Sequence, residues 1–395
     1  MPTHEFTVAG GGLAGLISAI ALAEKGARVR LLERSAHLGG RAATQYQKGF
    51  ALNLGAHALY RSGPLYQVLE RWGIPFSGGR PKLQESAYLV VEERKYTFPI
   101  DAMRLLMTGA LSLSEKLEAA NVLRKLGGGF EPSPGLTVSQ WLDQDSLSPR
   151  VRKLAEMLIR LSTYSNEMSR LSAAAAVSQV RFGMRNGVLY LDGGWETLIR
   201  GLAAKAVAMG VVVETGQSIG DVHPGTILAL PPDEVERLTG VRLPARIPVR
   251  AACLDLGLRR LPKTSALFAM DLDEPLYFSV HSASARLAPE GSASVQIVRY
   301  MRSDEKADRK QLESFADLLL PGWRIEADVA RFLPDMIVSH AVPSPSGRAD
   351  VQIPGLPGVA VAGDWVGQSH MLADAAASSA IEAAEVVWRR RAVAA

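Results

Sequence analysis

Apolar residues alternate along the chain between short runs and longer helical patterns, and the first complete unit lies at the N-terminus. The run 6–9 predicts a short buried strand. The glycine-rich segment 10–15 follows it and leads into a helix rich in Ala, Leu and Ile that ends near Gly26. Residues 28–33 then predict a second strand. A strand, a helix and a strand in this order form a crossover, so the two strands are expected to be parallel.

Similar units recur in the middle and at the end of the chain. Residues 196–209 predict a helix, and the apolar strand 211–214 follows it. The apolar run 359–364 predicts another strand, which precedes a long alanine-rich helix at 373–391. Between these units, residues 247–300 alternate like antiparallel strands. The chain is therefore expected to leave its first α/β unit and return to it twice.

Length and composition limit the classes of protein that the chain can form. At 395 residues it exceeds what one hydrophobic core usually fills, so two domains are expected. The apolar fraction of 47% and the charged fraction of 21% are typical of a globular protein. The net charge of +4 is small, and the basic residues are interleaved with acidic ones. This distribution argues against a nucleic-acid partner.

Cys253 is the single cysteine of the sequence. An intrachain disulfide and a cysteine-rich metal site are therefore excluded, and a reducing cytoplasm is the expected location. No basic segment precedes the first apolar run, so a signal peptide is not expected. No apolar run reaches the roughly 18 residues that a membrane-spanning helix needs. A metal site is not predicted.

The glycines Gly10, Gly12 and Gly15 form the pattern GxGxxG between the first strand and the first helix. In this context the first glycine permits a tight turn, the second lets the backbone approach a pyrophosphate, and the third lets helix and strand pack closely. Leu13 and Ala14 begin the helix, whose unpaired N–H groups would face the phosphates. The pattern predicts a dinucleotide-binding site.

Glu33 ends the second strand about 20 residues further on, where a carboxylate accepts hydrogen bonds from ribose hydroxyls and disfavours the extra phosphate of NADP. Arg34 follows it, and the segment continues to Gly40 and Arg41. The run 33–41 resembles the second flavin signature of the protoporphyrinogen oxidase, phytoene desaturase and amine oxidase superfamily. The resemblance implies that Gly40 and Arg41 contact FAD.

Further segments resemble the same superfamily in the same order along the chain. Gly55, Ala56 and His57 are similar to a segment that passes close to the flavin ring. The run 193–198 is similar to the Gly-Gly segment that leads into the helix before the adenine-side strand. Ile219 falls where a hydrophobic residue contacts adenine through its backbone.

The run from 362 to 383 resembles the C-terminal flavin segment of the superfamily. Within it, the resemblance places Gly363 and Asp364 at the ribityl and pyrophosphate region of FAD. Met371 and Leu372 stand at the start of the last helix, whose N–H groups would point at the flavin pyrimidine and stabilise negative charge on the reduced ring.

The resemblance implies an α/β fold in which a Rossmann-like FAD-binding domain of the glutathione-reductase type is joined to a discontinuous α+β substrate domain. The FAD-binding domain is expected to comprise 1–75, 190–245 and 345–395, and the substrate-binding domain 76–189 and 246–344. No histidine or cysteine stands in an evident covalent-attachment motif, so non-covalent FAD is expected.

The expected activity is that of an FAD-dependent oxidoreductase that moves a hydride between a small hydrophobic substrate of the polyene or isoprenoid type and flavin N5, as desaturases and isomerases do. An amine or protoporphyrinogen oxidase that uses oxygen is one alternative. A prenyl-protein-binding chaperone of the same fold, without redox chemistry, is another, although the intact segments 33–41 and 363–364 argue against it.

Few side chains are candidates for chemistry beyond the flavin. His57 is predicted as a catalytic residue that poises a proton, although a histidine in such a loop is more often structural. His370 is a similar candidate. An amine oxidase would need an aromatic cage and a lysine near N5, and Lys263 is the one lysine of the central antiparallel region. It follows Pro262 in a turn-like setting and is expected to be a solvated loop residue.

The segment 101–126 carries a stripe of Leu and Met residues together with basic residues. We expect a helix that packs this stripe against the core. The alternative is that this face inserts into a membrane surface, from which the protein takes up a lipophilic substrate. The protein is thus expected in the cytoplasm, and the alternative adds peripheral contact with a membrane.

Overall fold

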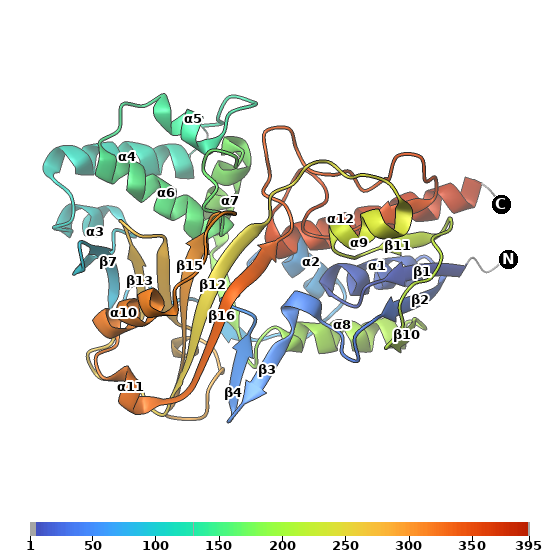
Figure 1. Cartoon of the computed structure of the whole chain (residues 1–395), viewed down its shortest axis with the longest axis horizontal. Helices are drawn as coiled ribbons and strands as arrows, with labels where there is room; N and C mark the ends of the chain where they lie inside the picture. Colours follow the sequence, from blue (N-terminus) through green and yellow to red (C-terminus); the bar gives the residue numbers. More distant parts are fainter. Residues whose placement is uncertain (1–4, 129, 394–395) are drawn as a thin grey trace.

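The computed structural model describes residues 5–128 and 130–393, and two sheets organise them. Figure 1 shows a parallel sheet near the chain termini and a larger, mainly antiparallel sheet at the other end of the elongated molecule. This mixture of a parallel sheet with helices and a second, mixed unit confirms the predicted α/β fold class. The elements of both sheets come from widely separated parts of the sequence.

The parallel sheet has the strand order β10-β2-β1-β11-β17, and each neighbouring pair is parallel. The central strands β1 and β11 and the edge strand β17 are largely buried, which explains their apolar runs, whereas β2 and β10 are partly exposed. The strands of this sheet are β1 (Glu5–Ala9), β2 (Arg28–Glu33), β10 (Val212–Thr215), β11 (Thr226–Leu228) and β17 (Val359–Val361).

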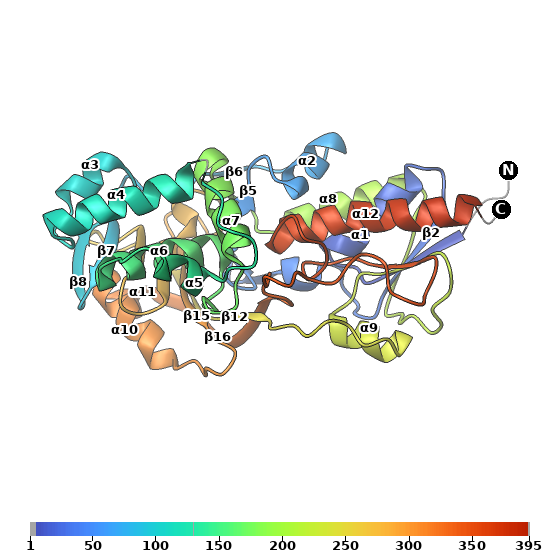
Figure 2. The same cartoon turned by 90° about the horizontal axis from the view of Figure 1, so that it is seen from above.

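Three helices cover one face of this sheet. Figure 2 shows α1 (Leu13–Ala23), α8 (Glu196–Ala208) and α12 (Leu372–Val393) side by side, with α9 (Pro232–Thr239) apart from them. The alanines of α1 and α12 pack into one apolar core with the strands. Small side chains let these helices approach one another closely, so the alanine-rich pattern of α12 is a packing feature.

The larger sheet has the strand order β16-β12-β15-β14-β13-β7-β8. All its pairs are antiparallel except β7 with β13, which joins the first third of the chain to the last. Its strands are β7 (Ala87–Val91), β8 (Arg94–Thr97), β12 (Val249–Leu258), β13 (Phe268–Asp271), β14 (Leu276–Val280), β15 (Ala293–Met301) and β16 (Ala327–Ser339).

Helices pack on both faces of the larger sheet and bury two separate apolar clusters. One face carries α3 (Ala102–Met107), α4 (Leu113–Gly127), α5 (Val138–Asp143), α6 (Pro149–Thr163) and α7 (Ala173–Asn186). The other face carries α10 (Arg309–Leu319) and α11 (Trp323–Glu326). Because both faces of β12 are covered, it is buried along almost its whole length.

Small elements connect the two sheets. The hairpin of β3 (Thr44–Gln47) and β4 (Phe50–Asn53) reaches from one to the other, and β9 (Val188–Leu191) pairs with both β5 (Leu59–Tyr60) and β6 (Gly78–Gly79). The helix α2 (Pro64–Arg71) packs against α12. Two 3₁₀ turns span Gly40–Ala42 and His281–Ala283.

The predicted helices and strands of the nucleotide-binding unit agree with the structure to within a few residues, whereas β16 and α10 were not predicted. β16 is an edge strand that contains Pro334, and it has no clean alternation of buried and exposed positions because its pairing with β12 shifts register along its length. Its sequence therefore lacks the two-residue period that marks a half-buried strand.

The prediction that the stripe of 101–126 faces the core is wrong for half of its members. Residues such as Leu105, Val122 and Leu126 are buried, but five large apolar side chains on α3 and α4 are between 64% and 73% exposed. The exposed residues are Met103, Leu106, Met107, Leu113 and Leu117.

None of the helices in the described part of the chain combines the length and the apolar character that crossing a membrane requires.

Candidate functional site: a dinucleotide cradle between two glycine turns

Gly10 and Gly15 are required by backbone packing at the turn between β1 and α1. Gly10 has a φ of +105°, and a Cβ there would lie 2.3 Å from the carbonyl oxygen of Ala229. A Cβ on Gly15 would lie 1.7 Å from the carbonyl oxygen of Gly10. Both contacts are far shorter than real Cβ atoms allow. These two glycines therefore let the helix start immediately against the strands.

Gly12 and Gly40 lie beside open space instead. A Cβ on Gly12 would meet only the Gly39 oxygen at 3.8 Å, and one on Gly40 would meet only the Gly12 Cα at 3.9 Å. A parallel bridge joins Gly12 to Gly39, so the two predicted glycine motifs lie next to each other. Leu13 and Ala14 start α1 at this point. The bare backbone and the helix N-terminus form a cradle that fits the pyrophosphate of a dinucleotide.

Glu33 stands at the carboxyl end of β2 beside this cradle. One carboxylate oxygen accepts a hydrogen bond of 2.7 Å from the Gly11 amide, and the other accepts one of 2.8 Å from the Ser35 amide. The amide of Gln217 donates to the Glu33 carbonyl at 2.9 Å. This bond brings the segment that contains Ile219 to the end of β2, where the sequence places the adenine. Arg34 is exposed at the same edge.

Arg41 and Asp364 form an ion pair that joins the second glycine motif to the C-terminal segment. The Arg41 guanidinium lies 2.6 Å from the Asp364 carboxylate and also donates to the Val338 carbonyl at 2.9 Å. His340 Nδ1 lies 3.4 Å from the other Asp364 oxygen. Burial alone would raise the pKa of Asp364, but the Arg41 charge and the His340 hydrogen bond outweigh it and hold this pKa well below its usual range.

The C-terminal segment from β17 to α12 is fixed by polar contacts that the sequence did not indicate. The Gly363 amide donates to the Ser379 hydroxyl at 3.0 Å. The buried Arg348 guanidinium donates to the carbonyls of Asp364 at 2.9 Å and Gly367 at 2.8 Å, and also to that of His370. Burial lowers the pKa of Arg348 to about 10. Arg348 lies in an irregular loop, so no periodic pattern marks it.

The start of α12 has an unusual backbone. Leu372 has a φ of +54°, in the left-handed region that non-glycine residues rarely adopt, and the preceding Met371 is buried. Leu372 and Met371 both pack against the apolar cluster of the larger sheet. The helix N-terminus therefore points to the junction of the two sheets, as the predicted flavin site requires.

His57 lies at the same junction and is held by structural contacts. Its Nδ1 lies 3.0 Å from the Gly55 carbonyl oxygen, and its ring meets the Trp195 ring edge-on at 5.0 Å between centroids. Burial lowers the pKa of His57, so the ring is neutral at physiological pH. A Cβ on Gly55 would lie 2.8 Å from the Met336 side chain. The catalytic role of His57 stays a prediction.

A cluster of buried tyrosines faces Ala56 from the larger sheet and its helices. The Tyr164 hydroxyl donates to the Ala56 carbonyl at 2.8 Å, and Tyr164 itself has a φ of +59° at the end of α6. Tyr300 meets the Tyr164 ring edge-on at 5.6 Å. Burial raises the pKa of Tyr164 well above its ordinary value. A side chain that holds a strained backbone at such a place is typical of a functional site.

The cluster continues deeper along the sheet. The Tyr277 hydroxyl lies 3.0 Å from that of Tyr190 and 3.1 Å from His281 Nε2. The rings of Tyr190 and His281 stack at 3.7 Å. Burial lowers the pKa of His281 to about 3, so its imidazole is neutral. The cluster thus offers aromatic surface and neutral hydrogen-bonding groups.

Two basic residues, Arg160 and Lys263, lie in different surroundings. Arg160 is buried, and burial lowers the pKa of its guanidinium. Tyr300 is among the nearby groups that interact with the Arg160 charge. Its Nη1 lies 3.9 Å from Glu156. Lys263 is exposed in a turn after β12, as expected of a solvated loop residue. Of these two side chains, the buried Arg160 is therefore the one whose charge acts on the tyrosine cluster.

A parallel sheet with a glycine turn at the first strand, an acid at the end of the second, and an Arg–Asp pair to the C-terminal segment defines a dinucleotide-binding flavoprotein. The family model described as flavin-containing amine oxidoreductase matches residues 13–236, which is more than half of the chain. The chain belongs to the flavin-containing amine oxidoreductase family, and its cofactor is a flavin.

Two further likenesses concern solved structures. An oxidoreductase from Methanosarcina mazei superposes with a TM-score of 0.77 and 19% identity, over 96% of this chain and 100% of that one. Cyclohexylamine oxidase from Brevibacterium oxydans IH-35A superposes with a TM-score of 0.72 and 14% identity, over 99% of this chain and 100% of that one. At these identities the likeness shows the fold alone.

A curated relative is similar in sequence over part of its length. The 4,4'-diaponeurosporene oxygenase of Staphylococcus haemolyticus (strain JCSC1435) is 22% identical in an alignment of 280 residues that covers 62% of this chain. The chain spans 53% of the length of that relative.

Proposed function

We propose that the protein is an FAD-dependent oxidoreductase that acts on a hydrophobic substrate of the polyene or isoprenoid type, as a desaturase or isomerase does. A bound flavin supplies the N5 atom that accepts or returns a hydride. The relative named for 4,4'-diaponeurosporene supports a polyene substrate. The protein's own residues would bind and orient the polyene and exclude water.

The observation that carries this proposal is the aromatic, uncharged cluster that packs against the segment of Ala56. Tyr164 is half-buried there and donates to the Ala56 carbonyl, Tyr300 and Tyr277 pack behind it in the core, and His281 is neutral because its pKa is about 3. Arg160, the buried charge beside Tyr300, is a cation and would repel an ammonium group. Such a surface suits a neutral, conjugated chain, since rings offer large apolar area without a charge to desolvate.

An anaerobic titration tests the proposal. The purified holoprotein would be mixed with 4,4'-diaponeurosporene, a protoporphyrinogen and cyclohexylamine in separate experiments while the visible flavin band is recorded. Bleaching by the polyene supports the desaturase type. The proposal would be overturned if neither the polyene nor its more saturated precursors bleached the oxidised flavin, restored the band of the reduced flavin or gave an isomerised product.

FAD would be held by the residues that line the cradle and its two flanking segments. On the pyrophosphate side these are Gly10, Gly12, Leu13, Ala14, Gly15, Gly40, Arg41 and Asp364. On the adenosine side they are Glu33, Arg34 and Ile219, and on the ring side Gly55, Ala56, Gly363, Met371 and Leu372.

We also propose that FAD is bound without a covalent link. Cys253 is buried and donates to Asp255 at 3.3 Å, and burial raises the pKa of its thiol well above the ordinary value. His57 is engaged with Gly55 and Trp195. Acid precipitation should therefore leave a colourless protein pellet and a yellow supernatant. A yellow pellet would contradict this proposal.

An amine or protoporphyrinogen oxidase that uses oxygen is the second candidate. The tyrosine cluster favours it, because aromatic rings also bind amines through cation–π contacts. Peroxide release with cyclohexylamine or a protoporphyrinogen, together with flavin bleaching by that substrate, would select this candidate over the first. A colourless preparation that binds prenylated protein would instead select the non-redox chaperone.

We further propose that the exposed apolar face of α3 and α4 contacts a membrane surface peripherally. Five large apolar side chains lie there at 64–73% exposure, an unusual concentration for a face turned to water. Arg104 and Lys116 flank them, and each is tied down by a neighbouring carboxylate or carbonyl. Insertion of the apolar side chains would provide most of the attraction.

Vesicle sedimentation tests the membrane contact. Leu113→Ser with Leu117→Ser should abolish binding to phosphatidylglycerol vesicles and leave the melting temperature nearly unchanged, since surface changes cost about 0.5 kcal/mol or less. The matched control is Ile325→Ser, whose side chain is 76% exposed on α11. Equal binding by the double variant and the control would contradict the proposal.

A further inference from the structure

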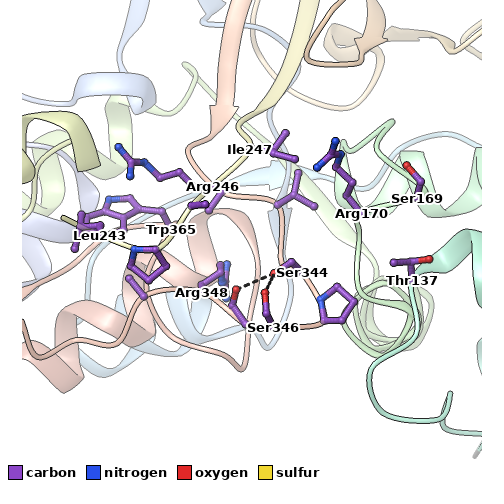
Figure 3. A pocket seen from close by; sticks show the side chains of 17 residues that line it. Thr137, Ser169, Arg170, Leu243, Arg246, Ile247, Ser344, Ser346, Arg348 and Trp365 are labelled. Carbon is purple, nitrogen blue, oxygen red and sulfur yellow. Dashed lines mark hydrogen bonds between the residues drawn. The ribbon is translucent and has the colours of Figure 1, made fainter.

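A cavity of about 350 Å³ lies behind the segment that holds the predicted flavin site. Three parts of the chain meet around it: the region before α7, the connection from α9 to β12, and the loop from β16 to β17 (Figure 3). Its volume falls within the range of small-molecule sites. None of the residues named for FAD lines it.

The walls of the cavity carry positive charge and hydroxyl groups. Arg170, Arg246 and Arg348 line it, together with Thr137, Ser169, Ser344 and Ser346, and the lining residues include no aspartate or glutamate. Arg246 is paired with Asp233 and Glu236 outside the lining.

The other two arginines keep hydrogen-bonding capacity. Arg170 is exposed, and within the described residues its guanidinium pairs with no carboxylate and donates to no carbonyl. Arg348 donates to three carbonyls, while a guanidinium has five N–H donors. The Asp364 carboxylate that offsets its charge faces Arg41 and His340 on the other side of the segment. The cavity therefore holds excess positive charge.

Apolar side chains complete the walls. Leu243, Ile247 and Val342 contribute aliphatic surface, Pro345 closes one side, and Trp365 contributes an indole. Figure 3 shows Ile247 and Arg170 in the upper part of the view and the loop that carries Ser344 and Arg348 below them. A ligand that fits such walls has an anionic group and an apolar body.

We propose that this cavity binds a small amphipathic anion, with a phosphate or carboxylate group toward Arg170 and Arg348 and an apolar part against Ile247 and Leu243. Arginine forks recognise planar carboxylates and phosphates through paired, charge-assisted hydrogen bonds. The site is separate from the proposed substrate surface beside Ala56 and does not depend on the proposed function.

Binding here would act on the flavin segment through Arg348. The Arg348 amide donates to the Gln368 side chain at 3.0 Å, and that side chain donates back to the Arg348 carbonyl at 2.7 Å. The Arg348 guanidinium holds the carbonyls of Asp364 and His370. An anion in the cavity would thus contact a side chain that ties the loop to the start of α12.

Calorimetric titration of the FAD-saturated holoprotein tests the proposal with three probes of one chain length. Hexyl phosphate and hexanoate carry the anionic group, and hexanol does not. We expect at least one of the two anions to bind, to weaken with added NaCl, and to shift the flavin absorption band, and hexanol to show no binding. The stronger of the two anions identifies the head group as phosphate or carboxylate.

Arg170→Gln should weaken the binding of the favoured anion about tenfold or more, because it removes a charge-assisted contact. Arg185→Gln is the matched control, since Arg185 is an exposed arginine on α7 outside the cavity. The flavin spectrum without ligand should be unchanged in both variants, which shows that they fold. Absence of binding by both anions, or equal affinities in the two variants, would overturn the proposal.

Discussion

The two sheets of this molecule carry their chemistry in different ways. Around the parallel sheet, the predicted cofactor residues are consecutive in short motifs at strand ends, and the backbone itself forms the cradle at Gly12 and Gly40. Around the larger sheet, the tyrosines beside Ala56 come from α6, β9, β14 and β15. A phosphate is recognised by backbone N–H groups, whereas a hydrophobic substrate is recognised by side chains assembled from many segments.

This difference has a consequence for mutations. A change in the cradle acts on the backbone and should have a large effect with a sharp positional dependence. A change among the tyrosines alters one of several similar contacts and should have a smaller effect.

Gly15→Ala should have the largest effect, because its Cβ would lie 1.7 Å from the Gly10 oxygen. We expect a loss of about 3 kcal/mol or more in the free energy of unfolding, measured with urea, and purification without FAD. Gly12→Ala is the control: its Cβ meets only an oxygen at 3.8 Å, so the apoprotein should lose about 1 kcal/mol or less while FAD affinity falls. Tight FAD binding by Gly12→Ala would place the pyrophosphate elsewhere.

Arg41→Ala should lower the free energy of unfolding by about 3 kcal/mol, because it leaves the buried Asp364 carboxylate without its charged partner. The pKa of Asp364 is lowered in the folded protein, so its stabilisation is present above the unfolded pKa and is lost as the pH falls. The loss caused by Arg41→Ala should therefore shrink at acidic pH. A double-mutant cycle with Asp364→Asn measures the coupling, and strict additivity would show that the pair contributes nothing.

Asp374 provides a test with the opposite sign. It accepts one hydrogen bond, of 3.0 Å from the Leu65 amide at the start of α2, and burial raises its pKa to about 7. Its contribution is fully present below the unfolded pKa and is lost as the pH rises through 7. Between pH 5 and pH 8 the free energy of unfolding of the wild type should fall by about 2 kcal/mol relative to that of Asp374→Asn. Parallel stability curves for the two proteins over this range would refute the raised pKa.

Tyr164→Phe should have the smallest effect. It should lower the free energy of unfolding by about 1 kcal/mol, since it removes one hydrogen bond to the Ala56 carbonyl and keeps the ring. With a polyene substrate, KM should change less than threefold. Tyr190→Phe, deeper in the cluster, should leave the flavin spectrum unchanged and serves as the comparison. A loss of turnover in Tyr164→Phe comparable to that of the cradle variants would mean that this hydroxyl takes part in the chemistry.

The sequence by itself determined the nucleotide-binding unit. GxGxxG, the acid at Glu33 and the strands around them lie within about thirty consecutive residues, and such local spacing fixes a turn, a helix start and a strand end. The family resemblance extended this to Arg41 and Asp364, which the structure brings together at 2.6 Å.

The rest of the molecule depends on its tertiary contacts. β16 was missed because its shifting register with β12 breaks the alternation of buried and exposed residues, and the stripe of α3 and α4 divides into buried and exposed residues that no sequence period separates. The contacts of Arg348, His340 and the tyrosines join residues far apart in the sequence. No period in the chain encodes such contacts, since they depend on which faces the folded elements present to one another.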